Sequence, residues 1–306
     1  METVVVGARG SRLAQAMVRE LVEHLSGCPV VTFSSRVVVT DGDKDRRSPI
    51  RELSSAGDGG LFTTQVEQEL LAGRIDIAVH SLKDLPTTGP DGLVLAVTQL
   101  RADTLDALCG STLAALCPGA RVGTGSARRV AQLKSLRPDL EVVSIRGNVP
   151  PRLTKLKSGL DAVILAAAGL RRLGLDDAIT ELLDPAVFPP SPGQGALAVQ
   201  VRRGDTELLE MLNAFGDVDA DAAVRAERAL LGELDGGCSA PVGAYATRDG
   251  GMLTLSGQVT SLDGRRAVTG TVTGTNPEPT GKELAGVLRA QGADAILDEI
   301  RRTANR

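Results

Sequence analysis

The sequence is poor in the residues that build metal and redox sites. It contains two histidines, His24 and His80, and its four cysteines form no CxxC pair. Neither histidine belongs to a two-histidine helical pattern or lies near a cysteine in the sequence, which excludes the usual zinc constellations. We therefore expect no metal, and we expect the cysteines to remain thiols in a reducing compartment.

The chain also lacks an apolar run long enough to cross a membrane, although 42% of its residues are hydrophobic. The first residues, METVVVGARG, have neither the basic region nor the apolar region of a secretory signal. A net charge of −4 argues against a general nucleic-acid binder. The composition predicts a soluble cytoplasmic protein without nucleic-acid or membrane partners, in which any anion site is local.

Arginine is abundant by contrast, since only six of the 34 basic residues are lysines. A biased composition is enough to explain a high arginine number, so the placement of the arginines carries the information. The planar guanidinium grips a carboxylate or a phosphate through paired hydrogen bonds that lysine cannot reproduce. Arginines at the ends of strands would therefore indicate an anion site.

Strands alternating with helices predict parallel sheets over most of the chain. The strand 3–6 leads to Ser11, a plausible N-cap, and to a helix with apolar residues every fourth position until 25. Further strands are expected at 30–40, 75–79, 121–122, 141–144 and 197–201, and a helix at 63–72. In such sheets, ligands bind beyond the carboxyl ends of the strands, where the arginines of this chain are concentrated.

After about residue 217 the pattern changes. A helix at 220–234 is followed by Gly236, Gly237 and Cys238, by strands at 242–247, 253–259 and 267–273, and by one long helix at about 282–301. This order is typical of an α+β domain. An isolated cysteine is more often a small buried residue, but the two glycines favour an exposed turn in which a bulky reactant can reach the Cys238 thiol.

Two polar motifs have ordinary interpretations as well as functional ones. GTGSARR, at 123–129, lacks the closing Gly-Lys of a nucleotide triphosphate loop and the third glycine of a dinucleotide fingerprint. Its two arginines oppose the helix dipole, which costs stability unless they face an anion or a partner. The ordinary alternative is a solvated helix face. Lys83 and Asp84 would be an ordinary surface pair, but they directly follow a buried strand and precede Pro86, where a carboxylate can be held rigidly.

Taken together, these segments resemble the hydroxymethylbilane synthase, or porphobilinogen deaminase, family. The similarity runs in order through GARGSRLA, TDGD, GLF, DIAVHSLKDLP, VGTGSARR, IRGNV, LAAAGLRRLGL, PGQGALAV and AERALLGELDGGCSAPVGAYA. The family resemblance implies a transferase of haem and porphyrin biosynthesis. It would condense four porphobilinogen molecules head to tail, with release of ammonia, on a dipyrromethane cofactor held by the Cys238 thioether.

The resemblance also implies a fold and a set of residue roles. The fold class is α/β, with two lobes like those of periplasmic binding proteins, a hinge, and a small C-terminal α+β domain. Its domains are expected at 1–97 with 198–216, at 98–197, and at 217–306, in a monomer. Asp84 would be catalytic, and Cys238 would anchor the cofactor. The cofactor would be bound by Lys83, Ser126, Arg128 and Arg129, and the substrate by Arg9, Ser11, Arg146, Arg152 and Arg172.

Some positions depart from the family pattern. Gly59 replaces a lysine before the Leu-Phe pair, Asp41 stands where some members have arginine, and Thr104 replaces a proline. Pro150 and Pro151 fix the backbone just before Arg152 and are expected to affect its placement. A different class also remains open, namely a non-catalytic two-lobed protein that senses or binds a small anion and needs neither Asp84 nor Cys238.

Overall fold

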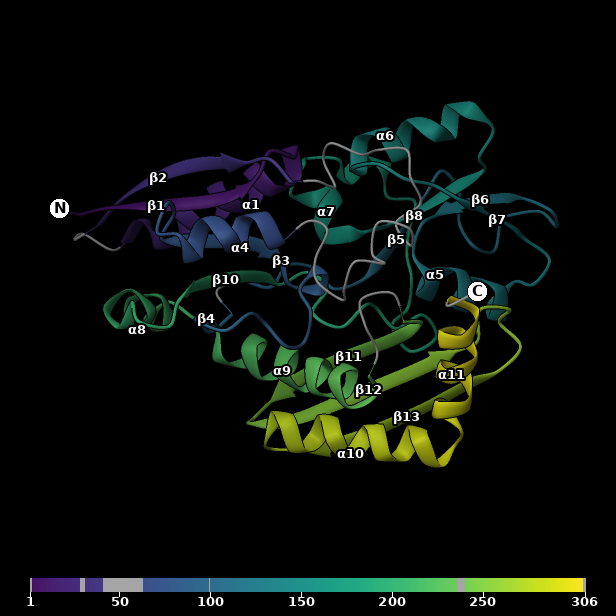
Figure 1. The fold of residues 1–306 in the computed structure, drawn as a ribbon. Helices are drawn as coiled ribbons and strands as arrows, with labels where there is room; N and C mark the ends of the chain where they lie inside the picture. Colours follow the sequence, from purple (N-terminus) through teal and green to yellow (C-terminus); the bar gives the residue numbers. More distant parts are fainter. Residues whose placement is uncertain (1, 28–30, 41–62, 99, 236–239, 305–306) are drawn as a thin grey trace. The chain divides into compact units, whose positions relative to one another are not determined.

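The computed structural model describes residues 2–27, 31–40, 63–98, 100–235 and 240–304. Cys238, Asp41 and Gly59 lie outside these residues. The chain forms two compact units, one of residues 1–102 and 196–221, the other of residues 103–195 and 222–306. Figure 1 follows the chain through both units.

The first unit contains a five-stranded sheet with the order β2-β1-β3-β10-β4. The strands β2, β1 and β3 run parallel, while β10 is antiparallel to both β3 and β4. Helix α1 packs its Met17, Val18 and Leu21 into the apolar core of this sheet. The elements are β1 (Glu2–Arg9), α1 (Arg12–His24), β2 (Val31–Val38), α4 (Thr64–Leu71), β3 (Ile77–Ser81), β4 (Leu93–Leu95), β10 (Leu197–Arg202) and α8 (Thr206–Ala214), with short 3-10 turns η1 (Leu25–Gly27) and η3 (Leu82–Asp84).

The second unit repeats this arrangement in a sheet with the order β7-β6-β8-β5-β9. Here β7, β6 and β8 run parallel, and β5 is antiparallel to β8 and β9. The elements are β5 (Asp106–Cys109), β6 (Arg121–Thr124), α5 (Ala127–Leu136), β7 (Glu141–Ser144), α6 (Val149–Thr154), β8 (Ala162–Ala166), α7 (Ala167–Arg171) and β9 (Glu181–Leu182), with 3-10 turns η4 (Lys155–Ser158) and η5 (Asp176–Ala178). The two lobes therefore share strand order and strand direction, which confirms the predicted pair of similar α/β lobes.

The second unit also contains an antiparallel sheet, β11-β12-β13, packed against helices (Figure 1). Gly257 leaves room on one face of this sheet for Leu230 and Leu284, whose side chains would lie 2.8 and 3.0 Å from a Cβ there. This part forms the predicted C-terminal α+β region. Its elements are α9 (Val218–Glu233), β11 (Val242–Asp249), β12 (Met252–Thr260), β13 (Ala267–Gly274), α10 (Pro277–Ala290) and α11 (Ala293–Ala304).

The long helix predicted at 282–301 is wrong in one respect, because the structure has two helices there. Helix α10 ends at Ala290 and α11 begins at Ala293. Between them Gly292 has a φ of 102°, in the left-handed region that breaks an α-helix and favours glycine. The predicted three-domain boundaries and the hinge stay predictions, since the structure divides into two units and each is described by itself.

Candidate functional site

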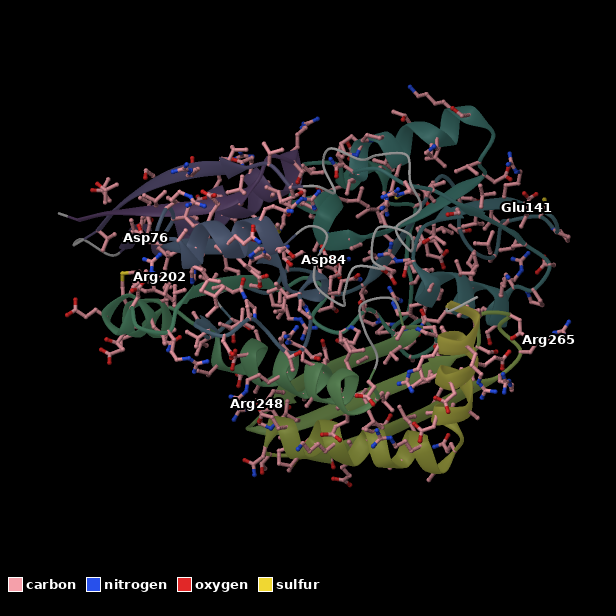
Figure 2. All side chains as sticks on the ribbon, in the orientation of Figure 1. Asp76, Asp84, Glu141, Arg202, Arg248 and Arg265 are labelled. Atoms are coloured by element: carbon pink, nitrogen blue, oxygen red, sulfur yellow. The ribbon has the colours of Figure 1, made fainter. Side chains whose placement is uncertain are left out.

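The carboxylate of Asp84 lies on the surface of the first unit, in the turn η3 that follows β3. Leu82 and Leu85 on either side are buried, and the Leu82 amide donates to the Ala196 carbonyl over 3.1 Å. These anchors hold the turn against β10 while Asp84 stays exposed. Figure 2 labels Asp84 beyond one end of β3 and Asp76 before the other, where Asp76 forms an ion pair of 2.8 Å with Arg202.

Arg9 and Ser11 reach the same edge of the first sheet. Arg9 is the last residue of β1, which runs parallel to β3, so the carboxyl ends of both strands lie at one edge. Ser11 caps α1, because its Oγ accepts from the Ala14 amide over 3.1 Å, as its position before the helix predicted. The first unit thus brings together four of the predicted site residues: Arg9, Ser11, Lys83 and Asp84.

His80 lies directly beneath this edge, in β3, and is 4% exposed. Burial, together with the positive charge of Arg9, lowers the pKa of His80 to about 4. His80 Nε2 and Gln200 Oε1 are both buried, and the Gln200 side chain opposes the lowering of the His80 pKa without reversing it. Gln200 Nε2 donates to Glu67 Oε1 over 3.0 Å. His80 is therefore neutral at neutral pH.

In the second unit, Ser126 caps α5 by accepting from the Arg129 amide, and the arginines of its first turn point inward. Arg128 donates to Asp106 Oδ2 through Nη2 over 2.7 Å and to the Pro189 carbonyl through Nη1 over 2.9 Å. Arg129 binds Asp106 Oδ1 through Nε at 3.0 Å and Nη2 at 2.6 Å. Asp106 is therefore an anion that Arg128 and Arg129 face, as the argument from the helix dipole expected.

The Asp106 cluster keeps a net positive charge in the interior. Asp106 is 0% exposed, and although burial alone would raise the pKa of its carboxyl, the charges of Arg128 and Arg129 hold that pKa well below its usual range. Gln194 also donates to Asp106 Oδ1 over 2.9 Å. One carboxylate faces two guanidiniums, and Arg128 Nε is buried without a hydrogen-bond partner in the described residues. A further carboxylate is the kind of ligand that this cluster would stabilise.

The other predicted arginines of the second unit follow its remaining parallel strands. Arg146 follows β7, and its Nη1 is buried without a hydrogen-bond partner among the described residues. Arg172 ends α7, after β8, and donates to the Gly195 carbonyl over 3.0 Å. Because β6, β7 and β8 are parallel neighbours, the segments carrying these arginines and Ser126 leave one edge of the sheet.

Pro150 and Pro151 are compatible with a helix here. They lie in the first turn of α6, where proline is tolerated because the first amides of a helix lack intrahelical partners. Arg152 follows them and donates from Nε to the Gly147 carbonyl over 2.6 Å. Gly147 has a φ of 114°, so the turn before the helix depends on glycine.

Sequence reasoning missed the glutamines of this region. Gln194 binds Asp106, and Gln132 accepts from Arg128 Nη1 over 2.8 Å. The spacing of Gln132, four residues after Arg128 on α5, was the available signal, because such residues are neighbours on a helix face. No comparable signal exists for Gln194, which meets Asp106 only through the tertiary fold.

The described residues contain neither a cluster of metal ligands nor a membrane-spanning helix. No group of three or more histidine, cysteine, aspartate or glutamate side chains there is arranged to hold a metal ion. Among the same residues, no helix is long and apolar enough to cross a membrane.

Comparison with known families gives two matches. Residues 4–210 match the model described as porphobilinogen deaminase, dipyromethane cofactor binding domain. Residues 222–290 match the model of the porphobilinogen deaminase C-terminal domain. Together these matches take in both α/β lobes and most of the C-terminal region.

Curated relatives extend this similarity to nearly the whole chain. The porphobilinogen deaminase of Roseiflexus castenholzii is 46% identical over 302 residues, which covers 96% of this chain and 98% of the relative. That of Staphylococcus carnosus is 43% identical and covers 98% of this chain and 99% of the relative. Among solved structures, a putative methionine-binding lipoprotein from Bacillus subtilis is similar with a TM-score of 0.44 at 14% identity, over 70% of this chain and 89% of the other.

Proposed function

Because the chain belongs to the porphobilinogen deaminase family, we propose that Asp84 is the catalytic carboxylate and Cys238 the cofactor anchor of this hydroxymethylbilane synthase. The enzyme is a transferase of tetrapyrrole biosynthesis that condenses four porphobilinogen molecules and releases ammonia. The alternative of a non-catalytic anion sensor is not favoured. The observation that carries the residue assignment is the exposed Asp84 carboxylate at the sheet edge that also bears Arg9 and Ser11.

The described residues fit a cofactor that carries carboxylates. Dipyrromethane supplies the pyrrole α-carbon at which the chain starts, and its acetate and propionate groups need cations. Arg128 and Arg129 give the Asp106 cluster one positive charge in excess, and Arg128 Nε has no partner among the described residues. We assign cofactor binding to these arginines, with Ser126 holding the first turn of α5 and Lys83 as a further cation at the end of β3.

Asp84 is placed to act on the reacting pyrroles. Each condensation breaks the bond between the aminomethyl carbon and nitrogen of porphobilinogen and forms a carbon–carbon bond to a pyrrole α-carbon, which loses its proton. A fixed carboxylate stabilises the positive charge that develops on the pyrrole nitrogen as ammonia leaves, and after the carbon–carbon bond forms it accepts the proton that the α-carbon loses. The buried Leu82 and Leu85 hold Asp84 in place, which limits the reorganisation needed during the reaction.

Substrate binding is assigned to the remaining cations. Arg9 and Ser11 end β1 and begin α1 in the first unit, whereas Arg146, Arg152 and Arg172 follow strands of the second. Every added pyrrole brings two carboxylates, so the negative charge of the product grows with each step. Arg146 Nη1, buried without a partner in the described chain, is the best supported of these ligands.

We infer that the enzyme acts in the cytoplasm and as a monomer. The Cys238 thiol must stay reduced until it forms the thioether, and the cytoplasm keeps thiols reduced. Fractionation of cells and light scattering of the purified protein test these two points.

Intact-mass measurement tests the assignment of both residues. Protein made in cells that supply porphobilinogen should carry the added mass of a dipyrromethane, and Cys238→Ser should not. Asp84→Asn should fold and load, yet lose at least about 100-fold in turnover, a typical contribution of a general acid or base. An unmodified wild-type protein, or normal turnover by Asp84→Asn, would refute the corresponding assignment.

A further inference from the structure

The side chain of Gln132 joins three separate segments of the second unit. It lies on α5 and is 2% exposed. Its Oε1 accepts from Arg128 Nη1 over 2.8 Å, and its Nε2 donates to the Pro189 carbonyl over 3.0 Å and to Gln258 Oε1 over 2.9 Å. The amide therefore binds Arg128 with its acceptor, and its two donors bind the segment at Pro189 and the C-terminal sheet at Gln258.

The Gln132 amide approaches the C-terminal sheet closely at a glycine in β11. Gln258 in β12 pairs in register with Gly243 in β11. A Cβ on Gly243 would lie 2.6 Å from the Pro189 carbonyl oxygen and 2.8 Å from Gln132 Nε2, closer than real Cβ contacts allow. The next residue, Ala244, donates its amide to the Pro190 carbonyl over 2.8 Å. A glycine at position 243 permits this close approach.

A second buried contact holds the segment that follows Pro189 and Pro190. Glu227 in α9 is 0% exposed, and its two oxygens accept from the Gly193 amide at 2.8 Å and the Ala246 amide at 2.9 Å. Gln194, the next residue after Gly193, binds Asp106. Hydrogen bonds and the peptide bond between Gly193 and Gln194 thus connect the buried arginine cluster to the C-terminal sheet and to α9.

We propose that Gln132 is a positioning residue, which orients Arg128 toward the cofactor and fixes it relative to the C-terminal region that carries Cys238. This inference rests on the proposed function. A cofactor tethered by Cys238 and gripped by Arg128 is held at both ends, so its geometry depends on the distance between lobe and C-terminal region. A buried, fully hydrogen-bonded amide at their junction keeps that distance constant.

Two variants separate the two sides of the Gln132 amide. Gln132→Glu keeps an acceptor for Arg128 and removes the donors to Pro189 and Gln258, but it also adds a carboxylate that offsets the excess charge of the Asp106 cluster. Gln258→Leu adds no charge and therefore decides the test. Gln258→Leu removes only the link to the C-terminal sheet and leaves the contact with Arg128 intact. Ser256→Ala is the matched control. Ser256 lies two residues earlier on β12, and among the described residues its Oγ forms a hydrogen bond only with Thr271 Oγ1, at 2.9 Å.

The measured quantity is the rate at which each full-length variant, made without porphobilinogen, gains the dipyrromethane mass when porphobilinogen is added at saturation. We expect Gln132→Glu and Gln258→Leu to load roughly three- to tenfold more slowly, the factor for one lost hydrogen bond. Once loaded, both should keep the wild-type KM for porphobilinogen, because the assigned substrate ligands are untouched. Ser256→Ala should load at the wild-type rate.

The outcomes distinguish this inference from the proposed function. A wild-type protein that never gains the mass refutes the proposed function. The positioning role is overturned if the wild-type protein loads and Gln258→Leu loads within twofold of it, whatever the rate of Gln132→Glu. Slowing of Ser256→Ala to the same extent as Gln258→Leu also overturns it. If Gln132→Glu does not fold, the loading rate of Gln258→Leu alone tests the positioning role, because Gln258 is only half-buried.

Discussion

The buried His80 should make the first unit sensitive to mild acid. The pKa of His80 falls from its ordinary 6.5 to about 4 in the folded protein. Between these values the unfolded chain binds a proton that the folded chain does not, so stability is lost as the pH falls through this window. From pH 7 to pH 5 the loss works out at about 2 kcal/mol for this one group.

Replacing His80 by glutamine tests this estimate, since glutamine has no proton to gain. We expect the difference in unfolding free energy between pH 7 and pH 5 to shrink by about 2 kcal/mol in His80→Gln. Circular dichroism in urea follows the unfolding, because the chain has no tryptophan. Hydrogen exchange of the β3 peptide reports the same change within the first unit.

The other histidine supplies the control. His24 lies on α1 and its Nε2 is 2.9 Å from the Phe215 carbonyl oxygen. Because His24→Gln leaves His80 in place, this variant should keep the wild-type difference between the two pH values. A His80→Gln variant with an undiminished pH dependence would show that another group titrates, and the reasoning from burial and from the Arg9 charge would fail.

Two further substitutions address the second unit. Asp106→Asn leaves Arg128 and Arg129 buried with no carboxylate between them. The variant should lose about 3–5 kcal/mol of unfolding free energy, measured by urea denaturation. A loss below about 1 kcal/mol would mean that the arginines find other partners or water. Arg146→Leu should leave loading intact but let elongation intermediates accumulate, visible by intact mass, because its buried Nη1 is assigned to a substrate carboxylate. An unchanged intermediate pattern would remove Arg146 from the substrate site.

Local sequence signals were sufficient for the elements and the ends of the strands. Polar or charged residues follow β3, β6 and β7 within three positions of the strand ends, namely Lys83 and Asp84, Ser126, and Arg146, so their position at a sheet edge was predictable. The N-cap Ser11 was predicted by residue type and position alone. The repeat of strand order between the lobes was implied only by the family resemblance.

These local signals could not predict which residues meet through the tertiary fold. Asp106 lies 22 residues before Arg128, and nothing in the spacing says that a strand on the far side of β8 will turn its carboxylate toward α5. The dipole argument required an anion or a partner for Arg128 and Arg129 but did not identify one. The break at Gly292 was missed for a different reason, because an isolated glycine in an apolar helical pattern is often tolerated within one helix.

The charge of the Asp106 cluster limits what this part of the molecule binds. Without Asp106 two buried guanidiniums would repel each other at a cost of several kcal/mol, whereas a second internal carboxylate would leave no charge for a ligand. A single aspartate leaves the cluster with one excess positive charge. That charge suits one carboxylate of the cofactor, but not a product that gains two carboxylates with every condensation. The growing chain must therefore be neutralised by other cations. Arg146 meets that requirement, because no described residue binds its buried Nη1. Arg129 is less suited to the growing chain, because each of its three nitrogens already donates to Asp106, Ile164 or Gln194.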